Sequence, residues 1–221
     1  MHTHMKYIDE LKEILAGEVS TTSSVLEQNS EDTSIFHVQP ECVVYPKDTQ
    51  DLQKLVRFVG EHPEITLTAR AAGTDMSGGP LTSSVVVSMT EHFNEIRTVR
   101  EDYAVVQPGV FYRDFERKTL EKGVLLPCYT ASKELNTVGG MVANNSAGEK
   151  SLTYGKTEKW VRALKVVLSD GNEYEFRKLS RAAFEQKKAQ EDFEGALYRN
   201  IEKLILENKA LIQAQRPTVS K

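Results

Sequence analysis

The sequence predicts an α+β fold, with a small parallel unit first and a mainly antiparallel lobe after it. Strand, helix and strand patterns follow one another between residues 42 and 69. A βαβ order implies parallel strands, because a crossover helix returns the chain to the same edge. Farther along, residues 169–172 read Ser-Asp-Gly-Asn between two β-prone segments. Asp-Gly in that position is typical of a tight hairpin.

The first 36 residues are predicted to form a helix and a polar arm ahead of the main domain. Apolar side chains recur at helical spacing in residues 7–15, which indicates a short amphipathic helix. Residues 20–33 are rich in Ser, Thr, Glu and Asp and predict a loop or a poorly ordered arm. We expect one domain over residues 37–221, with a first lobe at about 37–100 and a second at about 101–221.

The first lobe is expected to contain three strands and one helix. Residues 42–45 are β-prone, and Asp48 is placed to cap the helix that follows. Between residues 52 and 59, four apolar side chains recur at helical spacing and predict one buried face. Residues 65–69 form the next predicted strand. Residues 85–87 are continuously apolar, which is typical of a strand covered on both faces.

The second lobe is expected to alternate strands and helices. Residues 103–107 predict a strand, and residues 114–122 predict a helix that Gly123 ends. The hairpin should span residues 161–176. An apolar stripe at helical spacing over residues 193–212 predicts a C-terminal helix, most simply one that faces a core.

Composition excludes several classes of protein. The 221 residues are 39% hydrophobic and 27% charged, and the net charge of −4 comes without a basic cluster, so nucleic acid is not an expected partner. Cys42 and Cys128 lack metal-like spacing, so we expect small apolar groups rather than a disulfide or a metal site. The charged N-terminus does not resemble a signal peptide, and no apolar run is long enough to span a bilayer. We therefore predict a cytoplasmic location, and peripheral membrane association of a full-length protein stays open.

Residues 70–80 are the most informative segment, because they place three glycines between two apolar strands. Glycine accepts positive φ, and successive N–H groups in such a loop form a concave nest for phosphate oxygens. Gly73 and Gly78 have the spacing of a P-loop, but Gly79-Pro80 replaces its Lys-Ser/Thr pair. No G-x-G-x-x-G motif opens a helix. By itself this segment predicts either a phosphate-like ligand or a tight surface turn.

A second cluster, residues 127–148, combines small residues with hydroxyl and amide side chains. Such a stretch can run close to a flat ring or a diphosphate, or it can form a helix packed tightly against a neighbour. The two clusters together resemble the FAD-binding domain of the vanillyl-alcohol oxidase/PCMH superfamily. The similarity is to its glycolate oxidase and D-lactate dehydrogenase branch of FAD-linked oxidases.

Four motifs carry the resemblance, in the family's order, over residues 40–176. Residues 70–79 resemble R-G-x-G-T-G-L-S-G-G. Residues 137–148, followed by Tyr154-Gly155, resemble T-I-G-G-x-x-A-x-N-A-G-G and the later Y-G. Residues 106–110 resemble V-x-P-G-V, and residues 166–171 resemble V-V-L-x-D-G.

The resemblance implies that residues 70–79 hold the diphosphate of FAD and that Pro127, Ser132 and residues 137–148 line the adenine, ribityl and flavin side. The implied FAD-binding residues are Arg70, Ala71, Ala72, Gly73, Thr74, Asp75, Met76, Ser77, Gly78, Gly79, Pro108, Gly109, Pro127, Ser132, Thr137, Val138, Gly139, Gly140, Ala143, Asn144, Asn145, Gly148, Tyr154 and Gly155. Relatives that attach flavin covalently use a His in the first loop. Residues 70–80 contain none, so we expect non-covalent FAD.

Two residues depart from the first motif. Ala72 and Asp75 stand where the family usually carries Gly. An inward carboxylate at Asp75 would repel a diphosphate, so we expect this side chain to point outward.

The implied activity of the full-length protein is FAD-dependent oxidation of a small 2-hydroxy acid such as D-lactate or glycolate. The family's substrate-binding cap follows the FAD domain, and residues 215–221 resemble the point at which relatives continue into N-x-A-G-Y. We therefore expect no catalytic residue in this chain, a domain incomplete at its C-terminus, an excised piece or truncated gene product that is inactive alone, and self-association through exposed apolar surface. A non-catalytic flavin-binding accessory subunit and an NADPH-using cell-wall precursor reductase are the alternatives.

Overall fold

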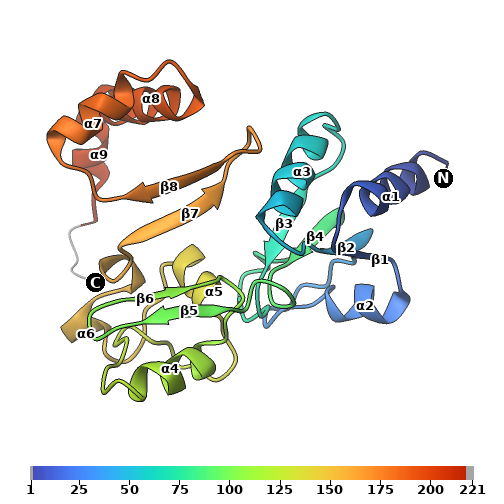
Figure 1. Cartoon of the computed structure of the whole chain (residues 1–221), viewed down its shortest axis with the longest axis horizontal. Coiled ribbons are helices and arrows are strands. Elements are labelled where there is room, and N and C mark those ends of the chain that lie inside the picture. The colour runs from blue at the N-terminus through green and yellow to red at the C-terminus, as the bar shows by residue number, and fades with distance from the viewer. Residues whose placement is uncertain (1, 218–221) are drawn as a thin grey trace. The chain divides into compact units, whose positions relative to one another are not determined.

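The computed structural model describes residues 2–217, with side chains from Tyr7 onward, and its contacts define two compact units (Figure 1). The first unit contains the described residues up to Val161, together with Val167–Glu173. The second contains Arg162–Val166 and the described residues from Tyr174 onward. Part of the segment expected to mark the incomplete C-terminus, residues 218–221, lies outside the described residues.

A four-stranded sheet organises the first unit, in the order β1 (Glu18–Ser20), β2 (Cys42–Tyr45), β4 (Val85–Ser88) and β3 (Leu67–Arg70). Strands β2 and β3 both run parallel to β4, which confirms the parallel unit. They are not neighbours, however, because β4 lies between them. All four residues of β4 are buried, as its apolar run predicts. Strand β1 adds an antiparallel edge on β2.

Helices α1 (His2–Ile14) and α3 (Thr49–Gly60) cover this sheet. Leu11 and Leu55 are fully buried and share one core cluster with residues of β2 and β4. The cap on α3 is confirmed, since Oδ1 of Asp48 accepts the N–H of Asp51 at 3.0 Å. Asp51 is itself buried, and its carboxylate accepts the N–H groups of Ala16 and Gly17 at 2.9 and 2.8 Å. It therefore fixes the end of α1 to the start of α3.

The prediction of an irregular arm over residues 20–33 is wrong in part. The segment contains the end of β1 and helix α2 (Ser23–Gln28). After α2 the chain turns back, so that Glu31 and His37 form an isolated β-bridge. Polar composition does not reveal this order, because the partners that fix the arm lie far along the chain.

The rest of the first unit is built around a second core cluster of five residues: Val110, Tyr112, Phe115, Cys128 and Met141. Its elements are the antiparallel pair β5 (Ile96–Val99) and β6 (Ala104–Val106), helices α4 (Tyr112–Leu120), α5 (Val138–Ala143) and α6 (Ser151–Tyr154), and a 3₁₀ turn η1 (Thr157–Lys159). Gly123, at φ +70°, follows α4 as predicted. Strand β5 is absent from the predicted elements.

Strands β7 (Ala163–Val167) and β8 (Glu173–Arg177) lie mostly in the second unit and pair around a turn that belongs to the first unit, with Gly171 at φ +72°. The predicted hairpin is confirmed. Helices α7 (Arg181–Lys188), α8 (Phe193–Glu207) and α9 (Lys209–Gln215) follow. Asn208 divides the predicted C-terminal helix into α8 and α9, and Asp192 caps α8 by accepting the N–H of Gly195 at 2.8 Å.

Cys42 and Cys128 are free and buried, each inside a separate core cluster, so both behave as small apolar groups as predicted. No helix within residues 2–217 is long and apolar enough to cross a membrane.

Candidate cofactor-binding site

The first glycine-rich loop leaves the carboxyl end of β3, where parallel strands commonly present ligands. Gly73 and Gly78 have φ values of +68° and +84°. An L-residue rarely adopts this region, so the loop needs glycine at both positions. The sequence therefore builds a turn that exposes successive backbone N–H groups.

The Asp75 carboxylate turns into this loop, and the prediction that it points outward is wrong. Its Oδ2 accepts the N–H groups of Ser77 and Gly79, both at 2.9 Å, and the Ser77 hydroxyl at 2.7 Å. The reason is proximity: free N–H groups of the turn are the nearest donors. The Gly79 N–H, followed by the Ser77 hydroxyl, holds the pKa of Asp75 below its ordinary value.

The N-terminal arm covers the same loop. Oδ2 of Asp32 accepts the N–H of Gly78 at 3.0 Å, and Thr33 donates its N–H and hydroxyl to the carbonyl of Asp75 at 3.0 and 2.6 Å. The ring of Phe36 lies 3.0 Å from where a Cβ on Gly78 would be. Sequence reasoning missed these arm residues because 46 positions separate Asp32 from Gly78, and no local pattern links them.

Arg70 lies beneath the loop rather than on its exposed side. Its buried guanidinium donates to the carbonyls of Glu31 and Asn29 at 2.7 and 3.4 Å. Burial lowers the pKa of Arg70, which the negative charge of Asp32 partly opposes. A Cβ on Gly73 would lie 2.4 Å from Nη2 of Arg70. Arg70 therefore joins the arm to the base of the loop.

The second glycine-rich segment packs backbone against backbone. Thr137, 1% exposed, caps α5 by accepting the N–H of Gly140 at 3.2 Å. The N–H of Gly139 donates to the carbonyl of Pro108 at 2.8 Å. A Cβ on Gly139 would lie 2.5 Å from that of Pro108, a distance that no side chain tolerates. Residues 106–110, the V-x-P-G-V-like stretch, therefore pack against the first turn of α5.

The two glycine-rich segments meet. A Cβ on Gly140 would lie 3.7 Å from the Cβ of Ala71. The N–H of Met89, just after β4, donates to the carbonyl of Arg70 at 2.9 Å. A Cβ on Gly109 would in turn lie 2.0 Å from the Met89 carbonyl oxygen. The structure thus brings together three of the motifs that sequence predicted for one site.

Residues 127–136 form a polar turn after buried Pro127. The hydroxyls of Thr130 and Ser132 lie 2.9 Å apart, and Nδ2 of Asn136 donates to the Thr130 hydroxyl at 2.6 Å. Oδ1 of Asn136 is buried with no hydrogen-bond partner. A buried acceptor of this kind needs a donor, and the hydroxyls of a bound cofactor are of the right chemistry.

The remaining predicted residues lie at the end of α5 and on α6. Ala143 ends α5 and Asn144 follows it. Asn145, at φ +44°, exchanges hydrogen bonds with Glu158. Gly148 lies against the carbonyl of Tyr129. Tyr154, 45% exposed, ends α6, and Gly155 follows it with its N–H donating to the Ser151 carbonyl at 2.8 Å. These residues form the turn after α5. The contact with the loop at residues 70–79 is made instead by Gly140, inside α5.

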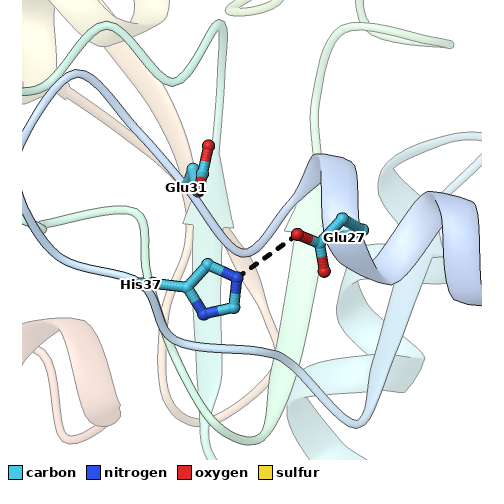
Figure 2. Close-up of side chains that lie close together, drawn as sticks. All are labelled: Glu27, Glu31 and His37. Carbon is cyan, nitrogen blue, oxygen red and sulfur yellow. Dashed lines mark hydrogen bonds and ion pairs between the residues drawn. The ribbon is translucent and has the colours of Figure 1, made fainter.

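An exposed cluster on the arm contains Glu27, Glu31 and His37, whose ligand atoms lie within 4.8 Å of one another (Figure 2). Nε2 of His37 lies 3.4 Å from Oε1 of Glu27 and 3.0 Å from the Ser30 hydroxyl. Glu31 meets His37 through its backbone. A hydrogen bond between His37 and Glu27, together with the arm's own turn, accounts for this cluster.

The loop presents hydrogen-bond donors that suit an oxyanion. Two N–H groups and one hydroxyl already converge on a single carboxylate oxygen of Asp75. A concavity that holds one oxyanion suits the oxygens of another. Next to it, Gly140 carries no side chain toward Ala71, so a cofactor can approach the backbone there.

A family model described as an FAD binding domain matches residues 40–177, more than half of the chain. The chain therefore belongs to this family of FAD-binding domains. FAD is the cofactor of the family, so the chain contains a flavin-binding domain.

Curated relatives extend the similarity. Glycolate oxidase subunit GlcD of Bacillus subtilis is 32% identical over 143 residues, which are 63% of this chain and 30% of that protein. D-2-hydroxyglutarate dehydrogenase of Pseudomonas putida is 28% identical over 93% of this chain and 21% of its own length. D-lactate dehydrogenase of Anaerostipes hadrus is 30% identical over 74% of this chain and 35% of its own length. The chain thus spans about a third or less of these relatives.

Solved structures share the fold. The 4-ethylphenol oxidase of Gulosibacter chungangensis superposes with a TM-score of 0.68 at 22% identity, over 79% of this chain and 35% of that one. The α+β fold of a PCMH-type FAD-binding domain, predicted from sequence, is confirmed.

Proposed function

We propose that the loop at residues 70–79 and the segment at residues 137–148 form one non-covalent FAD site. The observation that carries this proposal is the contact distance between Ala71 and Gly140, because it unites two motifs that lie far apart in sequence. In this arrangement the loop N–H groups bind the diphosphate. Ser132 and Asn136 offer polar groups to the ribityl hydroxyls, and Gly140 lets the flat rings approach the backbone.

The cofactor site is tested by FAD titration of the purified protein, followed by the flavin absorption band and fluorescence. Gly140→Leu should lose most of the affinity, because its side chain enters the space beside Ala71. Gly60→Leu is the matched control, since a Cβ on Gly60 meets nothing within 4 Å. Equal affinity in wild type and Gly140→Leu would place FAD elsewhere.

Non-covalent binding follows from the absence of His in residues 70–80. Acid precipitation of the FAD-loaded protein should leave the yellow colour in the supernatant. Colour retained in the washed pellet contradicts this proposal. We extend the proposal to a cytoplasmic location, which fractionation of the native host with antibody detection tests.

In a protein of the relatives' length, we propose oxidation of a small 2-hydroxy acid, with D-lactate and glycolate as first candidates. The bound FAD supplies the acceptor for the two electrons removed from the hydroxyl-bearing carbon. Support comes from relatives named for glycolate, D-lactate and D-2-hydroxyglutarate. Anaerobic bleaching of the full-length protein by one of these acids is the expected result. A flavoprotein that none of them bleaches would instead be an accessory module.

Self-association of the present chain is proposed through α8, on which Ile201, Leu204 and Ile205 are about half exposed. Apolar patches of this kind favour association. Sedimentation should show oligomers in wild type and a shift to monomer in Leu204→Glu. The matched control Lys203→Glu changes charge at an exposed polar position on the same helix. A monomeric wild type at high concentration contradicts this.

A further inference from the structure

Three consecutive N–H groups of the glycine-rich loop donate to carboxylates of the chain itself. Those of Ser77 and Gly79 bond to Asp75, and that of Gly78 bonds to Asp32. The loop thus carries two negative charges at the place where the proposed function puts the diphosphate. In the family that this loop resembles, the position of Asp75 is usually Gly.

A diphosphate entering the loop needs the same donors. An N–H group makes one strong, well-aligned hydrogen bond, so a phosphate oxygen and a carboxylate oxygen exclude each other on it. Like charges at this range also repel. The nearby cation is Arg70, which faces Asp32 electrostatically, but its guanidinium is buried on the carbonyls of Asn29 and Glu31.

Neither carboxylate is locked in place by burial, although Oδ1 of Asp32 also accepts the N–H of Ser34 at 2.8 Å within the arm. Asp32 and Asp75 are only partly buried, so either side chain can rotate into water without burying a charge. Asp51 is the contrasting case, because its carboxylate is 1% exposed and accepts the N–H groups of Ala16, Gly17 and Lys47. A diphosphate can therefore displace the partly exposed carboxylates of Asp32 and Asp75, whereas the buried carboxylate of Asp51 stays in place.

We propose that Asp32 and Asp75 are internal anions that compete with the diphosphate of FAD for the N–H groups of residues 77–79, and so set its affinity. The proposal rests on the FAD site of the preceding section. Because Asp32 belongs to the arm, loading of FAD also releases one of the contacts between arm and loop. Thr33, which donates to the Asp75 carbonyl rather than its carboxylate, keeps the arm in place.

The test is FAD titration, by flavin fluorescence, of wild type, Asp75→Asn and Asp32→Asn. Asn keeps the shape but removes the charge, and charge-assisted hydrogen bonds are about twice as strong as neutral ones. Each variant should therefore bind FAD roughly fivefold to tenfold more tightly. Asp192→Asn is the matched control, because it removes a carboxylate from a backbone N–H in the second unit, and its affinity should equal that of wild type.

A second readout isolates the diphosphate. Inorganic pyrophosphate, titrated in the absence of FAD, should bind Asp75→Asn more tightly than wild type. Circular dichroism melts show whether each variant is folded. FAD affinity that stays equal or falls in both Asn variants means that the carboxylates brace the loop, and this overturns the proposal.

Gly140→Leu distinguishes failure of the inference from failure of the site. If Gly140→Leu loses affinity while both Asn variants bind like wild type, only the competition is wrong. If Gly140→Leu binds like wild type, or no protein binds FAD, the proposed site fails and the competition with it.

Discussion

The two glycine-rich segments use glycine for different physical purposes. In residues 70–79, Gly73 and Gly78 supply positive φ, and the N–H groups that this exposes bind carboxylates. In residues 137–148, Gly139 and Gly148 let backbone approach backbone, and a Cβ on either would meet another chain segment within 2.5 Å. In the first segment, glycine thus exposes N–H groups that bind carboxylates. In the second, glycine lets two stretches of backbone pack closely.

This difference determines what substitution should do. A change in the packed segment strains the fold whether or not cofactor is present. A change in the loop alters anion binding first and stability second. Two substitutions test this comparison, and a third, at Asp51 outside both segments, gives a buried reference. They follow in order of decreasing effect on the free energy of unfolding.

Gly148→Ala should have the largest effect, a loss of about 3 kcal/mol of unfolding free energy. Its Cβ would lie 1.8 Å from the carbonyl oxygen of Tyr129, so backbone must move. Denaturant melts measure this loss of unfolding free energy. Gly60→Ala is the control, at an open helical position, and should change stability by under about 1 kcal/mol. A stability loss equal to that of the control would show that the second segment is not packed as described.

Asp51→Asn should cost about 2 kcal/mol, because its carboxylate accepts the N–H groups of Ala16, Gly17 and Lys47. Burial raises the pKa of Asp51, but these bonds outweigh it and the net shift is downward. The contribution is thus complete above the unfolded pKa of about 4 and is lost as pH falls through the folded value.

Urea melts of wild type and Asp51→Asn between neutral and acid pH measure this effect. The gap between the two proteins should be widest at neutral pH and should narrow in acid. Asp75→Asn, on a half-exposed carboxylate, should leave stability nearly unchanged. A difference in unfolding free energy that widens in acid would contradict a lowered pKa of Asp51.

Gly78→Ala should have the smallest effect on stability, about 1 kcal/mol, which is the cost of positive φ for an L-residue. Its Cβ would also touch the ring of Phe36 at 3.0 Å. FAD affinity should fall, because strain at a φ of +84° turns the N–H of residue 78, a donor proposed for the diphosphate, away from its present direction. Unchanged affinity with reduced stability would assign Gly78 to the fold alone.

Sequence predicted the parts of this fold that depend on local pattern. Strand β2, the cap at Asp48 and the hairpin turn at Gly171 follow from apolar runs and turn residues. The insertion of β4 between β2 and β3 does not, because strand order depends on long-range packing. Strand β5 was missed because Arg97 and Thr98 interrupt its apolar run.

The candidate site was predictable in its motifs but not in its contacts. Glycine spacing indicated the loop, whereas the bonds from Asp32 and Thr33 cross more than 40 residues of chain. The predicted outward direction of Asp75 is wrong, because the loop's own N–H groups attract its carboxylate.

Amide hydrogen exchange with and without FAD tests the central claim most directly. One site built from both segments predicts slower exchange in residues 72–79 and in residues 137–148 at the same FAD concentration, while α8 stays unchanged. Protection in only one segment, or in neither while FAD is bound, would contradict it.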